Sequence, residues 1–179
     1  MTRGKAIACC LLLAGSASAT FAQAPPVAAP DQLALLRSAD PKLAANKKLV
    51  FDMYRSIVNA GRTDLAGRFF TEGYIQHNPN VESGRDALVK YIGQTRPVRP
   101  IPDTIGFPVI SIMAEGDMVL VASVEYADDP EKPGSRYTTT HFDLYRVENG
   151  LIAEHWDNLQ KSKAALTTDP NVTNQPLKP

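Results

Sequence analysis

Apolar residues recur at helical spacing in the first half of the chain and alternate with polar residues after position 108. The first such stretch predicts an amphipathic helix over residues 41–60. Asp40 can cap this helix, Pro41 suits its first position and Gly61 ends it. The apolar positions of this helix are Leu43, Val50, Met53, Tyr54, Ile57 and Val58.

Two shorter helices are predicted before the main run of strands begins. One covers residues 63–70, and the other starts at Ser83, which together with Asp86 resembles a capping box. Between them, residues 74–80 indicate a short strand that enters a turn. Pro79 supports this, because a proline pushes the residue before it into extended geometry.

From residue 109 onwards the alternation is that of β-strands. Strands are predicted over residues 109–113 and 118–126, and a hairpin over residues 141–157 turns at Asn149-Gly150, since both residues tolerate positive φ. Helices followed by strands indicate an α+β domain, with about three N-terminal helices packed on one face of a bent antiparallel sheet. Such a sheet leaves a concave cleft that suits a small ligand.

The register of this hairpin decides which side chains share a face. A two-residue turn, with residue 148 opposite 151, separates His155 and Asp157 from His141 and Asp143. A three-residue turn, with residue 147 opposite 151, places His141 opposite Asp157 and Asp143 opposite His155, all on one face. The second register sorts polar from apolar side chains better, so we prefer it. In this register the other face of the hairpin is apolar and consists of Phe142, Leu144, Ile152 and Trp156. An exposed apolar face needs a covering partner, which suggests a dimer.

Two carboxylates and two imidazoles on one wall form an acid–base set, because burial and neighbouring charges can separate their pKa values. The competing interpretation is a purely structural His–Asp pair across the strands, a contact worth about 0.2–1 kcal/mol. His77 is a weaker candidate, and the tyrosines are expected mainly to pack. The predicted catalytic residues are Asp157, His155 and His77, and the predicted substrate contacts are Asp143, His141, Tyr54, Asn78 and Trp156.

Composition excludes several other classes of function. Nineteen basic and nineteen acidic residues cancel and no basic block is present, so no nucleic-acid partner is expected. The histidines lack the spacings of zinc sites, and neither a glycine-rich phosphate loop nor a nucleophile elbow occurs. We therefore predict that the protein uses no metal and no cofactor.

The N-terminus has the pattern of an export signal. Arg3 and Lys5 precede an apolar run over residues 7–15, and small residues follow to position 24, with cleavage fitting after residue 19, 22 or 24. The run is shorter than the ~20 residues that span a bilayer. The predicted organisation is a signal peptide (1–24), a Pro/Ala-rich linker (25–40), one domain (41–166) and a loose tail (167–179), in a periplasmic or secreted protein with no membrane association after cleavage.

Four segments carry a family resemblance. They are Tyr-Ile-Gln-His-Asn-Pro at 74–79, Ala-Glu-Gly-Asp at 114–117, Asp-Leu-Tyr-Arg-Val-Glu-Asn-Gly at 143–150, and Glu-His-Trp-Asp-Asn-Leu-Gln at 154–160. With them, about residues 46–162 resemble the SnoaL-like polyketide cyclase family, and most of all its bacterial branch of predicted aldol-condensation enzymes.

This resemblance implies a nuclear transport factor 2-like fold, a cone-shaped α+β barrel with an interior pocket, commonly dimeric through its sheet. Members of the family close rings by aldol condensation without a metal or a Schiff base, using an acid–base Asp that corresponds to Asp157. A second site position corresponds to about Asp143, where the antibiotic cyclases carry His instead. The implied ligand is a small carbonyl or polycyclic compound.

Three hypotheses about function follow. In the first, the protein is an acid–base enzyme in which Asp157 removes a proton next to a carbonyl group while His155 or His77 stabilises the enolate oxygen. In the second, it is a periplasmic module that binds a small ligand without chemistry. In the third, it is a dimeric scaffold with a filled interior. A cavity on which Asp157, His155 and His77 converge would favour the enzyme.

Overall fold

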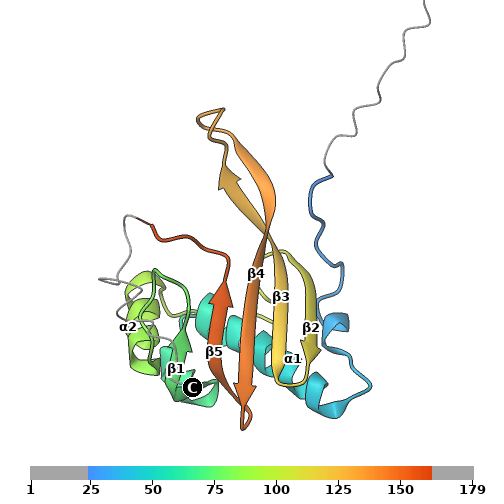
Figure 1. The fold of residues 1–179 in the computed structure, drawn as a ribbon, viewed down its shortest axis with the longest axis vertical. Coiled ribbons are helices and arrows are strands. Elements are labelled where there is room, and N and C mark those ends of the chain that lie inside the picture. Colours follow the sequence, from blue (N-terminus) through green and yellow to red (C-terminus); the bar gives the residue numbers. More distant parts are fainter. Residues whose placement is uncertain (1–23, 163–179) are drawn as a thin grey trace, which may run out of the picture.

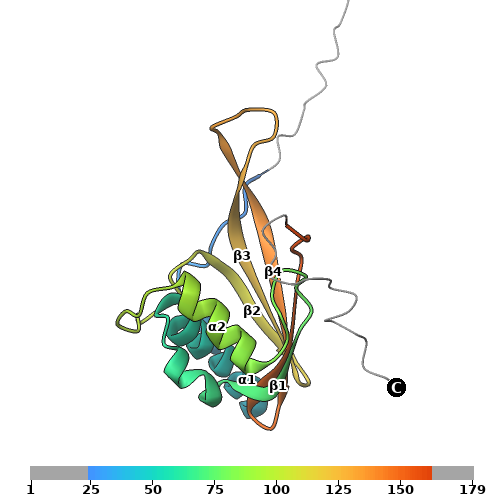
Figure 2. The same cartoon turned by 90° about the vertical axis from the view of Figure 1, so that its left-hand side faces the viewer.

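The computed structural model describes residues 24–162. The predicted tail and all but the last residue of the predicted signal peptide lie outside the described residues. Within the described part, helices cover one side of a single curved sheet, and the long hairpin of its middle strands projects beyond them (Figures 1 and 2). In the described part of the chain, no helix is long and apolar enough to cross a membrane.

The first predicted helix is present, but its last turns are unusual. Helix α1 (Pro41–Met53) is capped as expected, because the Asp40 carboxylate accepts hydrogen bonds from the backbone N–H groups of the next turn. The chain then continues as a π-helical segment, η2 (Tyr54–Asn59), and leaves it through Gly61 at φ +63°. A π-helical turn is rare and is often found next to a functional site.

The second and third predicted helices are also present, with one correction. A 3-10 helix, η3, covers Thr63–Arg68, and α2 covers Arg85–Thr95. The predicted capping box at Ser83 is wrong, because the residue before α2 is Gly84 and no side chain caps the helix. The Ser83 hydroxyl instead accepts a hydrogen bond from the backbone N–H of Gln76 at 3.0 Å, which ties the end of the first strand to the segment before α2.

Five strands form one sheet in the order β1-β5-β4-β3-β2. Their bounds are Phe70–Gln76 for β1, Val109–Glu115 for β2, Met118–Asp128 for β3, Arg136–Glu148 for β4 and Leu151–Asp157 for β5. The four C-terminal strands pair antiparallel as predicted, but β1 lies parallel to β5, so the sheet is mixed rather than antiparallel throughout. Because β1 and β2 are its two edges, the sheet stays open and does not close into a barrel.

The hairpin of β4 and β5 turns through two residues, so the preferred three-residue turn is wrong. Asn149 and Gly150 have φ of +51° and +78°, and Glu148 pairs with Leu151. One pair further on, the register shifts by one residue on β5, which makes Ala153 a β-bulge.

The bulge reverses the faces of the residues that follow it. Asp143 now lies opposite Asp157, and Tyr145 lies opposite His155. His155 and Asp157 therefore share a face with His141 and Asp143, as the sequence predicted, although through different pairs. Ile152 precedes the bulge and belongs to the buried core, so its expected place on the outer face is wrong.

The N-terminal segment predicted to be a linker makes specific contacts with the domain. The backbone N–H of Ala29 donates to the carbonyl of Val109 at 2.8 Å. The Gln32 side chain both donates to and accepts from the backbone of Ile105, and a short 3-10 helix, η1 (Ala34–Leu36), follows it. Residues 29–36 are therefore held against the domain.

Candidate functional site

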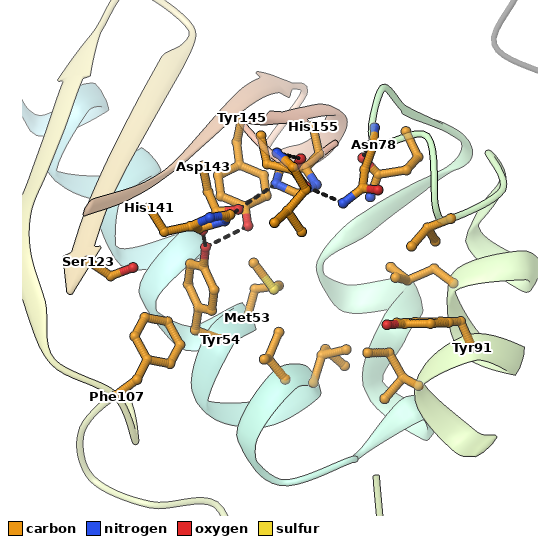
Figure 3. Close-up of a pocket in the computed structure, with 18 of the residues that line it drawn as sticks. Met53, Tyr54, Asn78, Tyr91, Phe107, Ser123, His141, Asp143, Tyr145 and His155 are labelled. Atoms are coloured by element: carbon orange, nitrogen blue, oxygen red, sulfur yellow. Dashed lines mark hydrogen bonds and ion pairs between the residues drawn. The ribbon is translucent and has the colours of Figure 1, made fainter. Parts of the chain in front are cut away.

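A cavity of about 550 Å³ lies between the inner face of the sheet and the helical layer. Most of its lining is apolar, and Figure 3 shows side chains from α1, α2 and the strands pointing into it. The apolar lining includes Met53, Ile57, Phe70, Leu88, Ile92 and Phe107. Polar groups gather on one side, where four residues of β4 and β5 form what we call the acid–base wall: His141, Asp143, His155 and Asp157.

Asp143 is the centre of a buried hydrogen-bond network. One carboxylate oxygen, Oδ1, lies 3.1 Å from Nε2 of His141 and 2.9 Å from Nε2 of His155. The other, Oδ2, accepts the hydroxyl proton of Tyr54 at 2.5 Å, and the Tyr54 oxygen accepts that of Tyr145 at 2.8 Å. Figure 3 shows these side chains converging from η2 and the sheet. The carboxylate is thus held by three donors.

The local backbone explains this convergence. Alternate residues of β4 point inward, so His141, Asp143 and Tyr145 lie in a row along the strand. Tyr145 also stacks on the imidazole of His155, with ring centroids 4.5 Å apart and planes 10° from parallel. Tyr54 begins the π-helical segment, which places its hydroxyl against the sheet.

The network separates the charges of its members. Burial raises the pKa of Asp143, but hydrogen bonds from His141 and His155 outweigh this and hold the pKa well below its usual range. The hydrogen bond to Asp143 raises the pKa of His141 above its ordinary value, although burial opposes the shift. Burial, followed by the negative charge of Asp143, raises the pKa of Tyr54. Near neutral pH, Asp143 is therefore an anion and Tyr54 is a neutral donor, while the raised pKa of His141 moves this side chain toward its cationic form.

Asp157 completes the wall from the end of β5. Its Oδ2 accepts a hydrogen bond from the Asn78 side-chain amide at 2.5 Å, and its Oδ1 accepts one from the backbone N–H of Leu159 at 3.0 Å. Asn78 is itself fixed, because its backbone N–H donates to the side-chain oxygen of Gln76 at 3.0 Å. Asp157 lies in the cavity lining and is only half-buried, so a ligand can reach a carboxylate that is held in place.

His77 and Trp156 do not lie in the cavity lining. They stack on each other, with centroids 4.5 Å apart, and His77 Nε2 lies 3.0 Å from a Glu154 oxygen on the outer face of the sheet. Of the three predicted catalytic residues, His155 and Asp157 therefore line one cavity, whereas His77 lies apart from them. Side chains alternate along β5, so residues 154 and 156 point away from the cavity that 155 and 157 face.

The sequence interpretation missed two members of the site. Tyr145 was expected only to pack, yet its hydroxyl extends the Asp143 network. Its position two residues after Asp143 on a strand was a usable signal, because both must face the same side. Glu125, whose carboxylate lies 3.7 Å from Nδ1 of His141, comes from β3, and no local motif points to it.

His141, Asp143 and Asp157 each offer one ligand atom within 4.8 Å of the others, close enough for a metal ion. The same spacing also follows from hydrogen bonding, since His141 bonds to Asp143 and Asn78 bonds to Asp157. The donor set is therefore already paired within the protein, and the spacing alone does not indicate an ion.

Comparison with known families places the chain. The model of the SnoaL-like domain matches residues 50–155, more than half of the sequence. The chain belongs to the SnoaL-like domain family. The match includes Tyr54, Asn78, Asp143 and His155, while Asp157 lies just beyond it. The family and the helices packed on one curved sheet confirm the predicted fold class, and the family supports a small-molecule ligand.

Several solved structures are similar to the chain at low sequence identity. A candidate polyketide cyclase from Acidithiobacillus ferrooxidans is 16% identical, with a TM-score of 0.47, over 68% of this chain and 89% of that one. A candidate SnoaL-like polyketide cyclase from Jannaschia sp. CCS1 is 18% identical, with a TM-score of 0.46, over 68% and 91%. An NTF2-like protein of unknown function from Burkholderia pseudomallei is 12% identical, with a TM-score of 0.46, over 65% and 91%. No protein of curated function matches the chain.

Proposed function

We propose that this SnoaL-like protein is an acid–base enzyme that acts on a small carbonyl compound. The observation that carries this proposal is the placement of Asp157. Its carboxylate lies in the wall of a largely apolar cavity, both of its oxygens accept hydrogen bonds, and Asp143 faces it from the neighbouring strand. A carboxylate held next to apolar surface is a good base for a weakly acidic C–H group.

The two carboxylates take different roles in this mechanism. Asp143 is occupied by three donors and supports the imidazoles, while Asp157 is half-buried and faces the ligand. Asp157 removes a proton from the carbon next to the carbonyl, and the electron pair of the broken C–H bond forms an enolate. His141, with its raised pKa, stabilises the enolate oxygen by charge and hydrogen bonding, and His155 supports it. The enolate then attacks a second carbonyl or takes up a proton elsewhere.

The direct pairing of Asp143 with Asp157 also supports a functional site. Like charges placed opposite each other on neighbouring strands destabilise a sheet. Placing two carboxylates opposite each other costs folding free energy, and titratable groups in such environments cluster at functional sites. The alternative function is non-catalytic binding of a small ligand, and the mutual pairing of the His and Asp side chains is the observation that favours it.

Proton exchange tests the enzyme hypothesis without knowledge of the natural substrate. We expect the protein to accelerate deuterium incorporation next to the carbonyl of 2-tetralone in D2O, followed by NMR, and the Asp157→Asn variant to lose this activity while keeping its circular dichroism spectrum. Asp117→Asn, at an exposed carboxylate in the turn between β2 and β3, is the matched control and should keep full activity. Equal exchange by the Asp157→Asn variant would show that Asp157 is not the base.

We further propose that the protein is exported and forms a homodimer through the outer face of its sheet. Residues 1–24 support export through the pattern of their sequence. The outer face supports a dimer, because Met113 and Phe142 are 50% and 45% exposed there and Trp156 lies nearby on the same face. Mass spectrometry of protein taken from the periplasm should show a mature chain that begins at residue 20, 23 or 25.

A further inference from the structure

The cavity has a cationic group on the side of the helical layer. Arg96 lies in its lining and follows the last residue of α2. Its backbone carbonyl packs close to Gly61, at the end of the π-helical segment, and the backbone N–H of Arg99 donates to Ala60 at 2.8 Å. Arg96 is therefore anchored to the helices, whereas the acid–base wall is part of the sheet.

The guanidinium of Arg96 has no ion pair or hydrogen bond with any side chain or backbone group within residues 24–162. The other arginine of the lining, Arg136, differs. It donates to the carbonyl of Tyr126 at 2.5 Å, lies 3.6 Å from the Asp128 carboxylate and covers the Tyr126 ring. Of these two cations, only Arg96 keeps all its donors available to a ligand.

Charge decides how a ligand with an anionic group would lie. The sheet side of the cavity carries the carboxylates of Glu125, Asp143 and Asp157, so a second anion placed there would be repelled. A planar guanidinium binds a carboxylate through two parallel hydrogen bonds and keeps its charge at any physiological pH. An anionic group would therefore lie at Arg96 and direct the rest of the molecule toward the acid–base wall.

We infer that Arg96 binds a carboxylate group of the ligand, so that the substrate is an apolar carbonyl compound with a carboxylate at the far end from its reacting carbon. This inference rests on the proposed function for the carbonyl part. The carboxylate part depends only on the cavity being the ligand site. Arg96 then determines specificity and orientation, and takes no part in the proton transfer.

A matched pair of probes tests this inference by binding alone. The probes are 2-naphthoate and the neutral 2-naphthamide, which share a ring system and differ in charge, with affinities measured by isothermal titration calorimetry. The full-length protein should bind 2-naphthoate roughly tenfold more tightly, the low end for a charged hydrogen bond at a solvent-exposed group. Arg96→Gln should abolish this preference, and Arg96→Lys should keep part of it. Arg37→Gln, the control at an exposed arginine outside the cavity lining, should leave it unchanged.

The outcomes separate this inference from the proposed function. Equal affinity for the two probes, undetectable binding of 2-naphthoate, or a preference that survives in Arg96→Gln would overturn the role of Arg96. Asp157→Asn should still prefer 2-naphthoate, because it leaves the arginine in place. If exchange activity proves absent while the Arg96-dependent preference holds, the enzyme proposal fails and the carboxylate site remains.

Discussion

Replacing Tyr54 with Phe removes one oxygen atom at the centre of the buried network. That oxygen donates to Asp143 at 2.5 Å and accepts from Tyr145 at 2.8 Å. Loss of a hydrogen bond to a charged group costs about 1.5–3 kcal/mol, and a buried donor left without a partner costs about 1–3 kcal/mol. Because Tyr145 is buried, both costs apply, and we take the low end of each range. The variant should lose about 2.5 kcal/mol of unfolding free energy.

Tyr145→Phe is the matched variant, because it deletes only the terminal donor of the same chain of hydrogen bonds. It should cost about 1 kcal/mol, the value of a neutral hydrogen bond. The double variant leaves no stranded hydroxyl, so its cost should be about 1–2 kcal/mol smaller than the sum of the two single costs.

Urea denaturation, followed by circular dichroism with the slope m compared between variants, measures all three free energies. The network interpretation is refuted if Tyr145→Phe costs as much as Tyr54→Phe. It is also refuted if the two substitutions add to within about 0.5 kcal/mol, as independent sites do. Either result would mean that the two hydroxyls do not form one chain ending at Asp143.

Three further predictions concern pH, backbone and assembly. The pKa of Asp143 lies below its ordinary 3.8, so its contribution to stability is complete above that pH and is lost as the pH falls through the folded value. The pKa of His141 lies above its ordinary 6.5, so its contribution is complete below that pH and is lost as the pH rises through the folded value. The urea midpoint should therefore be highest between pH 3.8 and pH 6.5. His141→Gln should reduce the fall of the midpoint with rising pH above this range, and an unchanged dependence of the midpoint on pH would contradict the role of His141. Gly61→Ala should destabilise the protein by about 3 kcal/mol in thermal unfolding, because its φ is +63° and the new Cβ would lie 2.8 Å from a backbone oxygen. Gly150→Ala, the matched variant, has a φ of +78° but open space around its Cβ, so it should destabilise the protein by only about 1 kcal/mol. Phe142→Glu should convert the proposed dimer to a monomer in light scattering, and a wild-type monomer would contradict the dimer.

Local patterns in the sequence were enough for most of the elements. The helical spacing of residues 41–60, the cap at Asp40 and the hairpin at Asn149-Gly150 depend on neighbours within a few residues. The structure contains all three, although the hairpin turns through two residues and not the preferred three. The strands from residue 109 onwards were predicted for the same reason, since alternation is itself a local property. The family resemblance, carried by short motifs, agrees with the matched domain over residues 50–155.

The composition of the acid–base wall was likewise accessible, but the arrangement around it was not. His141, Asp143, His155 and Asp157 were expected on one face, and they share it. Their pairs were predicted incorrectly. The two-residue turn alone would put His155 and Asp157 on the opposite face from His141 and Asp143, but the extra residue at Ala153 forms a bulge that returns them to the same face. No sequence motif predicts such a bulge, because the bulge results from how two paired strands satisfy their hydrogen bonds and bury their apolar side chains.

The sequence by itself determined which side chains could do acid–base chemistry and that they would occur on strands next to a helical layer. Only the tertiary structure decided that His77 lies outside the cavity, because its place depends on the parallel pairing of β1 with β5, two strands far apart in the chain. The same holds for Tyr54, whose hydroxyl meets Asp143 across 89 positions of sequence, and for Arg96 on the opposite side of the cavity. Periodicity is a property of neighbouring residues, whereas a cavity forms from contacts between distant segments, and these appear only when the chain folds.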